Sequence, residues 1–137
     1  MTEVQAQVLV PGAVTRARAL ALTAPISFWG GVDPKSGTVA DVRHPECGQV
    51  IAGRILLLPA TIGSSSAGAV LLELVHRGRA PAAVILHEPD AILLLGLIVA
   101  REMGWETPIA LRLDRDQYAA LHEREIDVGP TGLLTIT

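Results

Sequence analysis

The sequence predicts an α/β fold in which a central parallel sheet carries helices on one face and an added antiparallel β layer on the other. Three short runs, residues 55–58, 82–86 and 109–113, are apolar almost throughout, as strands are when both faces of a sheet are covered. Helix-patterned segments separate these runs, which favours parallel pairing. Strand-patterned segments on both sides of this β-α-β-α-β unit supply the second layer, so we expect a three-layer β/β/α arrangement.

The N-terminal part contains two predicted strands and a long loop. Residues 5–10 alternate polar and apolar side chains, and residues 17–22 form a second strand that ends before a proline. The Pro11-Gly12 pair between them suits a turn. From residue 30 to residue 53 the chain is rich in glycine and proline and has no strong period. Loops of this length are often functional in compact domains.

The two central helices are predicted from apolar spacing and from their boundary residues. Apolar side chains recur at helical spacing from Ala67 to Val75, and Gly78 ends this helix. Pro89 suits the first turn of the second helix, which runs to about Met103 and is capped by the next glycine.

The C-terminal part is predicted to hold a short helix and a hairpin. Residues 116–122 can form the helix that follows the third buried strand. Residues 124–128 and 133–136 then pair around the turn at 129–132, whose sequence is GPTG. This hairpin belongs to the antiparallel layer.

Length, composition and charge limit the possible function. The 137 residues predict a single domain over 1–137 with a core of aliphatic side chains, because half of the residues are apolar and only 3% are aromatic. A formal charge of -3 and scattered basic residues argue against a nucleic-acid partner. The longest apolar run, residues 91–100, is shorter than the roughly 20 residues of a membrane span. Residues 1–7 lack a secretory signal pattern, so we expect a cytoplasmic protein.

Metal-ligating residues are few and dispersed. Cys47 is the single cysteine, so it forms no internal disulfide and cannot alone hold zinc or an iron–sulfur cluster. The histidines at positions 44, 76, 87 and 122 share no ligand spacing. The sequence therefore predicts no metal site within this chain.

The most informative motif is GSSSAG at residues 63–68, between the apolar run at 55–58 and the helix that begins near Ala67. A strand that turns through glycine and serines into a helix directs hydroxyl and N–H groups to one point. An anion can bind there, or an alcohol can be placed for proton transfer. The alternative is an ordinary capped helix, with Ser65 or Ser66 as the N-cap and Gly63 in a tight turn. Neither a P-loop nor a Gly-x-Ser-x-Gly elbow is present.

A second motif, GGVDPKSG at residues 30–37, follows the apolar pair Phe28-Trp29. Asp-Pro-x-x-Gly is common turn chemistry, so one interpretation is a structural turn. The functional interpretation is a loop that shapes a cleft or docks a partner, with Trp29 as an apolar anchor beside Gly30, Gly31 and Asp33.

Several segments in order resemble the aconitase X small subunit, the swivel domain of a divergent branch of the aconitase superfamily. The resembling segments are residues 28–37, Asp41, His44-Pro45, residues 51–56, Pro59, residues 63–66, 80–83, 88–90 and 113–116. They cover nearly the whole chain, and the resemblance implies a swivelling β/β/α fold.

The resemblance also implies that the chain is one subunit of a heteromeric dehydratase and is not active alone. A larger subunit would carry the cysteines of an iron–sulfur cluster, which acts as Lewis acid on the leaving hydroxyl. A serine of the swivel domain would remove the proton. Trp29, Gly30, Gly31 and Asp33 would contact the larger subunit or shape the cleft.

The site residues follow from matching the aconitase motif Gly-Ser-Ser-Arg onto this sequence. Its first serine, the base, falls on Ser64, and Gly63, Ser65 and Ser66 become substrate-binding residues. Ser66 stands where aconitases have an arginine that can grip a carboxylate through a bidentate contact. This departure disfavours a tricarboxylate substrate.

Members of this family resemble two kinds of dehydratase. The serine-rich motif here looks more like the kind that acts on cis-3-hydroxy-L-proline and gives a pyrroline-2-carboxylate. The other kind acts on mevalonate 5-phosphate. A third hypothesis, from a different class, is a non-catalytic anion-binding or regulatory domain whose serine-rich turn holds a ligand.

Overall fold

The main strands form one mixed sheet whose central strands are parallel. In the computed structural model, which describes residues 2–137, the strand order is β1-β10-β9-β3-β6-β7-β8-β2. Strands β3, β6, β7 and β8 pair in parallel, and the other neighbours pair antiparallel. The strand bounds are β1 Thr2–Gln5, β2 Gln7–Val10, β3 Thr15–Ala21, β6 Ile55–Leu58, β7 Ala83–Leu86, β8 Ile109–Arg112, β9 Glu125–Val128 and β10 Leu133–Ile136.

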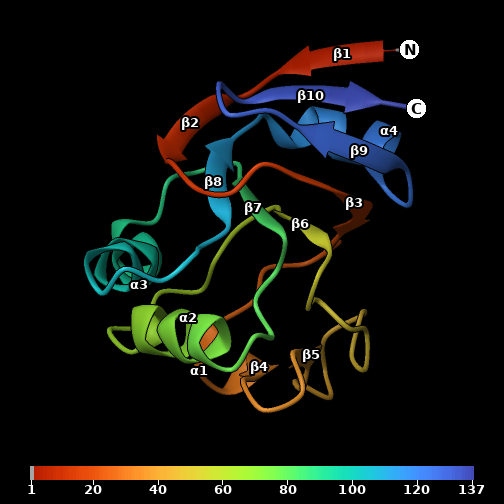
Figure 1. Cartoon of the computed structure of the whole chain (residues 1–137). Coiled ribbons are helices and arrows are strands. Elements are labelled where there is room, and N and C mark those ends of the chain that lie inside the picture. The colour runs from red at the N-terminus through yellow and green to blue at the C-terminus, as the bar shows by residue number, and fades with distance from the viewer. Residues whose placement is uncertain (1) are drawn as a thin grey trace.

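Strand β3 joins two layers because its two halves pair with different neighbours. Its residues 15–18 pair antiparallel with β9, and its residues 19–21 pair in parallel with β6. The N-terminal segment also spans both layers, since β1 lies on β10 and β2 lies on β8. Figure 1 shows β1, β9 and β10 above the parallel strands, with α2 (Ala67–His76) and α3 (Ala91–Glu102) below them.

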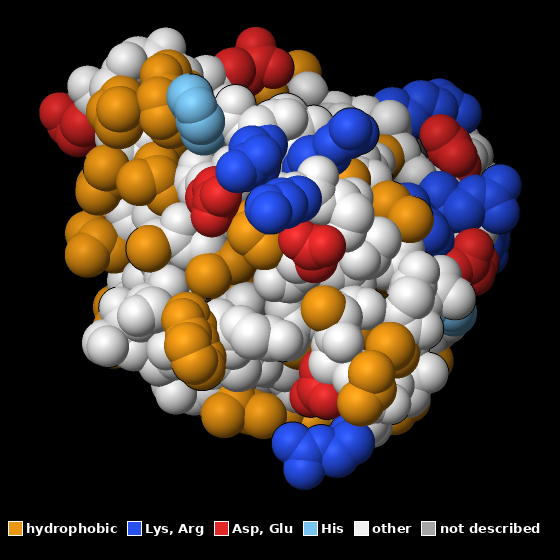
Figure 2. Space-filling view, turned by 90° about the horizontal axis from the view of Figure 1, so that it is seen from below, with side chains coloured by type: hydrophobic (Ala, Val, Ile, Leu, Met, Phe, Trp, Pro, Cys, Tyr) orange, Lys and Arg blue, Asp and Glu red, His pale blue; other side chains and the backbone are white. Residues whose placement is uncertain are grey.

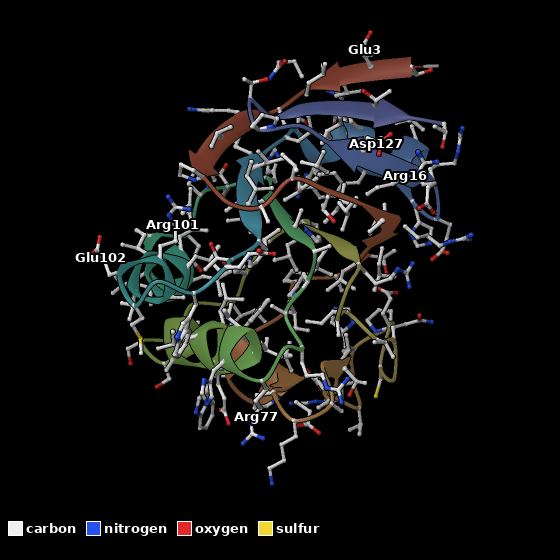
Figure 3. The ribbon with its side chains drawn as sticks, in the orientation of Figure 1. Glu3, Arg16, Arg77, Arg101, Glu102 and Asp127 are labelled. Atoms are coloured by element: carbon white, nitrogen blue, oxygen red, sulfur yellow. The ribbon has the colours of Figure 1, made fainter. Side chains whose placement is uncertain are left out.

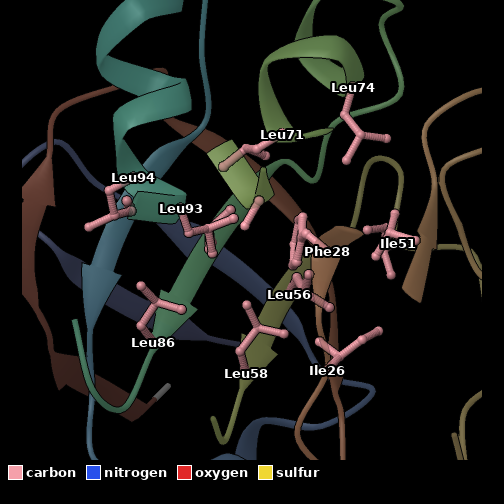
Figure 4. Packing of buried hydrophobic residues seen from close by; sticks show 14 of the residues in the cluster. Ile26, Phe28, Ile51, Leu56, Leu58, Leu71, Leu74, Leu86, Leu93 and Leu94 are labelled. Carbon is pink, nitrogen blue, oxygen red and sulfur yellow. The ribbon is translucent and has the colours of Figure 1, made fainter. Parts of the chain in front are cut away.

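Two apolar cores confirm the predicted β/β/α layers. Alternate residues of a strand point to opposite faces, so a strand covered on both sides must be apolar throughout. Leu56 and Leu58 of β6 belong to the core under α2 and α3, whereas Ile55 and Leu57 belong to the core against the antiparallel layer. All four are fully buried. Figure 4 shows the helix-side core, where Leu56 and Leu58 lie with Leu71 of α2 and Leu93 of α3.

Helices α2 and α3 approach closely at a pair of glycines. A Cβ atom on Gly68 would lie 2.5 Å from the carbonyl oxygen of Ile92, and one on Gly96 would overlap the carbonyl oxygen of Gly68. Because contacts this short do not occur, any larger residue at either position would push the helices apart. Helix packing therefore explains why position 68, the last of the GSSSAG motif, is occupied by glycine.

Several boundaries differ from those expected from the sequence. The strand expected at 5–10 is interrupted at Ala6, whose N–H donates to the Gly132 carbonyl at 2.9 Å. Helix α3 begins at Ala91, not at Pro89, because the carboxylate of Asp90 caps it by accepting from the N–H groups of Ile92 and Leu93. Strand β3 was expected to begin at residue 17 but begins at Thr15, because Thr15 already pairs with Val128 of β9.

Smaller elements complete the chain. The loop at 30–53 contains a short hairpin of β4 (Val32–Asp33) and β5 (Thr38–Val39), preceded by α1 (Phe28–Gly31). The expected short helix near 116–122 is a 3₁₀ turn, Arg115–Gln117, followed by α4, Tyr118–Leu121. The predicted C-terminal hairpin is confirmed as β9 and β10.

The outer face of the antiparallel layer is polar. Arg16 of β3 lies opposite Asp127 of β9, with 3.4 Å between Nη1 and Oδ2 (Figure 3). Such exposed pairs satisfy the solvent-facing side of the alternating strands. None of the helices in residues 2–137 is long and apolar enough to cross a membrane.

Candidate functional site

The serine loop, residues 59–66, leaves the carboxyl end of β6 and leads into α2. Its first half is fixed by the preceding segment of chain, because Thr61 forms a parallel bridge with Ile26. The N–H of Ile62 also donates to the carbonyl of Ile26 at 2.9 Å. The loop therefore begins from a rigid position at the carboxyl edge of the parallel strands, where α/β folds bind their ligands.

Ser64 accepts hydrogen bonds from the start of α2. Its Oγ accepts from the backbone N–H of Ser66 at 3.2 Å, and its carbonyl accepts from the N–H of Ala67, also at 3.2 Å. The first turn of a helix carries N–H groups without intrahelical acceptors and a partial positive charge. Negative charge that develops on the Ser64 oxygen would therefore be stabilised by the helix.

The other residues of the motif lie around Ser64. Ser66 occupies the N-cap position of α2, but its side chain makes no capping bond. Ser65 and Gly63 are exposed, and Ser64 is half-buried. Gly63 does not adopt a positive φ, and a Cβ atom there would meet nothing within 4 Å. Ser66 is therefore the N-cap residue that the alternative interpretation expected, but its hydroxyl makes no capping bond, and the conformation of Gly63 does not require glycine.

A second helix start lies next to the serine loop. Thr61 Oγ1 donates to Asp90 Oδ2 at 2.8 Å, while the other oxygen of Asp90 caps α3. Neither residue was given a role from the sequence, although Asp90 lies in segment 88–90, one of those that resemble the aconitase X small subunit. Only the position of Asp90 in the sequence could have indicated that it lies at this site. It follows the second parallel strand, and the carboxyl ends of parallel strands meet at one edge of the sheet.

Polar groups after β7 and β8 extend this edge. His87 Nδ1 accepts from the Arg115 N–H at 3.1 Å, so the ring proton lies on Nε2. Arg112 Nε donates to the His87 carbonyl at 3.0 Å. Asp114 accepts from the N–H of Asp116 at 2.9 Å, and this bond, the largest influence, lowers the pKa of its carboxyl. Asp114 is thus a capping residue.

The structure separates the four residues expected at a partner surface. Trp29 has 63% of its surface exposed, and Gly30, also exposed, adopts φ +82°. Gly31 is buried, and a Cβ atom there would lie 3.0 Å from Ile26 Cγ1. Trp29 and Gly30 are therefore available to a partner, while Gly31 has a packing role.

Asp33 is engaged within its own turn. Its Oδ1 accepts from the N–H of Lys35 at 2.9 Å, and its Oδ2 accepts from Ser36 Oγ at 3.1 Å. The hydrogen bond from Lys35, followed by that from Ser36, lowers the pKa of the Asp33 carboxyl. The carboxylate therefore stabilises the turn that presents residues 30–37.

The loop that contains His44 and Glu46 is held in place by these two side chains, to which the sequence assigned no role. Glu46 Oε1 accepts from the Thr23 N–H at 2.6 Å, and its Oε2 accepts from Thr23 Oγ1 at 2.8 Å. His44 is buried; its Nδ1 accepts from the Glu46 N–H, so its Nε2 donates to the Ala24 carbonyl at 3.0 Å. Both residues tie this loop to the carboxyl end of β3.

The chain does not offer a ligand set for an iron–sulfur cluster. Within residues 2–137 no group of three or more His, Cys, Asp or Glu side chains is placed to hold a metal ion. Cys47, the single cysteine of the sequence, is exposed. Clusters of this kind are held by several thiolates, so the residues present do not fit one.

Comparison with known proteins agrees with the fold. A family model described as the aconitase X swivel domain matches residues 3–132. A solved structure, Thermococcus kodakaraensis aconitase X in its holo-form, superposes with a TM-score of 0.85. The two chains are 27% identical, and the match covers 100% of this chain and 99% of the other.

Two curated relatives carry different names. A Pseudomonas aeruginosa protein named cis-3-hydroxy-L-proline dehydratase is 53% identical over 97 residues, which are 69% of this chain and 17% of that protein. A Methanopyrus kandleri protein named phosphomevalonate dehydratase small subunit is 41% identical over 91 residues, 66% of this chain and 64% of that protein. The chain thus spans less than a fifth of the first relative and just under two thirds of the second. Because the family model spans residues 3–132 and the fold agrees with it, the chain belongs to the aconitase X swivel domain family.

Proposed function

We propose that this chain supplies the swivel domain of an iron–sulfur hydro-lyase that dehydrates cis-3-hydroxy-L-proline, with Ser64 as the general base. The observation that carries the proposal is the position of Ser64 at the start of α2, where a backbone N–H donates to its Oγ at 3.2 Å. The 53% identity to a relative named for this substrate supports the choice of substrate.

The chain's part in the reaction is proton abstraction. Ser64 Oγ, as an alkoxide, takes the proton from the carbon next to the substrate carboxylate, and the hydroxyl on the neighbouring carbon leaves with its bonding electrons. A hydroxyl is a weak base at neutral pH, so the alkoxide needs stabilisation. Amide donors and the helix terminus supply it, and one such donor contributes about 3 kcal/mol in known oxyanion sites.

The residues around Ser64 would bind the substrate. Ser65 is exposed beside it, and Gly63 leaves open space where any side chain would project. Hydroxyl and N–H groups of Ser65 and Ser66 can donate to a single carboxylate. The absence of an arginine at position 66 suits a substrate with one carboxylate better than a tricarboxylate.

The remaining chemistry would come from a larger polypeptide of the same enzyme. A relative named as a small subunit supports such a partner. This polypeptide would ligate the cluster, since the present chain lacks the ligands, and Trp29 and Gly30 would contact it. An iron–sulfur enzyme and an exposed free Cys47 both suit a reducing cytoplasm.

A second candidate is the phosphomevalonate dehydratase small subunit. It is favoured by the 41% identity to the Methanopyrus kandleri protein, of which the match covers 64%. The same Ser64 would act on a different hydroxy acid, so the two candidates differ in substrate and not in the role of this residue.

Both candidates are tested by one reconstitution. The chain is co-expressed with its larger aconitase X subunit, purified without oxygen, and assayed for dehydration of cis-3-hydroxy-L-proline and of mevalonate 5-phosphate. We expect turnover of hydroxyproline by the wild type. Ser64→Ala should lower kcat by at least 10² because it removes the base, while Ser65→Ala should mainly raise KM.

The outcomes separate the hypotheses. Turnover of mevalonate 5-phosphate alone would select the second candidate. Near-normal kcat in Ser64→Ala would exclude this serine as the base. A wild-type chain that binds neither substrate nor a larger subunit would instead support a non-catalytic anion-binding domain.

A further inference from the structure

An apolar groove lies between α2 and α3 and begins beside the serine loop. The groove has a volume of about 220 Å³, and its lining includes Ser65, Ala69, Leu72, Ile92, Leu95 and Val99. The close contact of Gly68 with Gly96 forms part of this lining, since both glycines border the groove. A second hollow of about 350 Å³ adjoins the groove at Ala69 and Leu72; its other lining residues are Glu73, His76, Met103 and Trp105.

One wall of the groove is a stripe of exposed aliphatic side chains on α3. Ile92, Leu95, Val99 and Met103 are 49%, 54%, 37% and 54% exposed, and they recur every three or four residues on one side of the helix. None of the residues around the 220 Å³ groove is charged. Figure 2 shows hydrophobic side chains gathered on the left of the face seen there, with an acidic side chain and a histidine at their upper edge, whereas the basic side chains lie at the centre, right and bottom.

Such a surface is costly to leave in water. Burial of apolar surface contributes roughly 25 cal/mol per Å², and contiguous apolar patches on soluble domains usually mark an interaction site. The stripe faces away from the sheet, and the inner residues of α3, such as Leu93 and Leu97, already fill the core. The exposed stripe therefore has no role in folding the domain itself.

We propose that this groove docks the larger, cluster-bearing polypeptide of the enzyme through an aliphatic segment of that partner; the inference rests on the proposed function. Two observations select this occupant. The groove begins at Ser65, next to the proposed base, so whatever fills it also faces the serine loop. In the Pseudomonas aeruginosa relative the match covers 17% of the protein, so most of that protein lies outside the swivel domain and offers a large partner for its surface.

A second copy of this chain fits less well. A second copy seated in the groove would bring no cluster ligands to the side of Ser65, because it carries the same single cysteine. The larger polypeptide must bring the leaving-group chemistry to that side. Ser64 does not line the groove, so an occupant of the groove lies beside this serine and leaves its hydroxyl open to substrate.

The test measures binding of the chain to its larger aconitase X subunit. Leu95→Asp combined with Val99→Asp places two charges in the groove, and we expect at least 30-fold weaker binding, as for the loss of a central apolar contact. Val14→Asp is the matched control, because Val14 is 61% exposed and lies outside the groove. A milder variant, Leu95→Gln, should weaken binding in the same direction if the double variant fails to fold.

Each result decides the proposal. Loss of binding in the groove variants, with wild-type binding by Val14→Asp and unchanged thermal unfolding of the isolated chains, supports it. Unchanged binding in the groove variants overturns it. Sedimentation that shows a wild-type dimer broken by Leu95→Asp, with heteromer formation intact, also overturns it in favour of a second copy. A complex that depends on the groove residues but shows no turnover retains the groove and rejects the proposed reaction instead.

Discussion

Thr61 Oγ1 donates to Asp90 Oδ2 at 2.8 Å and thereby joins the serine loop to the first turn of α3. Asp90 serves both helix and loop, because its other oxygen accepts from the N–H groups of Ile92 and Leu93. One carboxylate thus fixes the helix start and the entry to the loop that carries Ser64.

This pair predicts separable effects on stability and on the site. Asp90→Ala should lower the free energy of unfolding by about 1–2 kcal/mol, because it removes an N-cap and the acceptor of Thr61. Thr61→Val keeps the cap, so it should cost less than Asp90→Ala and still reduce kcat of the reconstituted enzyme. Urea unfolding and steady-state kinetics measure the two effects. Equal stability of Asp90→Ala and the wild type would contradict the capping role.

Substitutions of Gly63, in the serine motif, and of Gly96, in α3, are expected to have opposite effects on stability. Gly96→Ala should be strongly destabilising, because its Cβ would overlap the Gly68 carbonyl in the neighbouring helix. Gly63→Ala should leave the thermal unfolding temperature unchanged, since nothing lies within 4 Å of the added methyl. If Gly63 borders bound substrate, the same variant should raise KM. Calorimetry of both variants is the measurement, and a folded Gly96→Ala of wild-type stability would refute the close helix contact.

Tyr118 predicts how the stability of the protein depends on alkaline pH. Because it is the single tyrosine of the chain, its ionisation can be followed directly by tyrosinate absorbance. Its hydroxyl donates to the Leu58 carbonyl at 3.0 Å, and burial raises the pKa of Tyr118. A raised pKa in the folded state means that stability is complete below the unfolded-state value of about 10 and declines as the pH rises above it. We expect tyrosinate absorbance to appear only as the protein unfolds.

Tyr118→Phe is the matched control for this titration. It should lose about 1 kcal/mol at neutral pH through the loss of this hydrogen bond, although the Leu58 carbonyl still accepts from the N–H of His87 at 3.4 Å. Its stability should depend less on pH above 10. Tyrosinate absorbance that develops in the folded wild type near pH 10 would show that the hydroxyl is accessible.

Arg54 and Glu123 predict a dependence at acidic pH. Arg54 Nη2 donates to Glu123 Oε1 at 2.9 Å, and this bond lowers the pKa of the Glu123 carboxyl. A lowered pKa means that the pair contributes stability above the ordinary value of about 4.3, and that the contribution is lost as the pH falls through the folded-state value. Because Glu123 is largely exposed, we expect well under 1 kcal/mol.

Glu123→Gln tests this pair. Its unfolding free energy should fall less steeply than that of the wild type below pH 5, while the Arg54 bonds to the carbonyls of Arg18 and Ala19 remain. Identical acid profiles for the two proteins would show that the pair contributes nothing. High salt should reduce the difference, as for any exposed ion pair.

Local patterns predicted the layers well because each layer leaves its own period in the sequence. Runs such as residues 55–58 are apolar throughout because a covered strand has no solvent face, and the polar alternation of the C-terminal hairpin reflects its one exposed face. The serine loop was found for the same reason, since its glycine and serines stand directly between a strand and a helix.

Contacts between residues that are distant in the sequence could not be predicted from local patterns. Ala6 divides the strand expected at 5–10, because Gln5 before it pairs with β10 and residues 7–10 after it pair with β8, at the opposite side of the sheet order. The sequence placed Gly68 in a serine motif, whereas in the structure Gly68 packs closely against Gly96 of another helix. Asp33 read as a surface residue, but its carboxylate is taken up by its own turn.

The sequence by itself determined the α/β class, the β/β/α layers and the placement of Ser64 at a helix start, because periodicity and turn chemistry are local properties of the chain. Only the tertiary structure decided that Asp90 holds the serine loop through Thr61 and that α2 and α3 meet at two glycines beside an open apolar groove. Those relationships depend on which surfaces pack together, and packing joins residues whose separation in the sequence carries no signal.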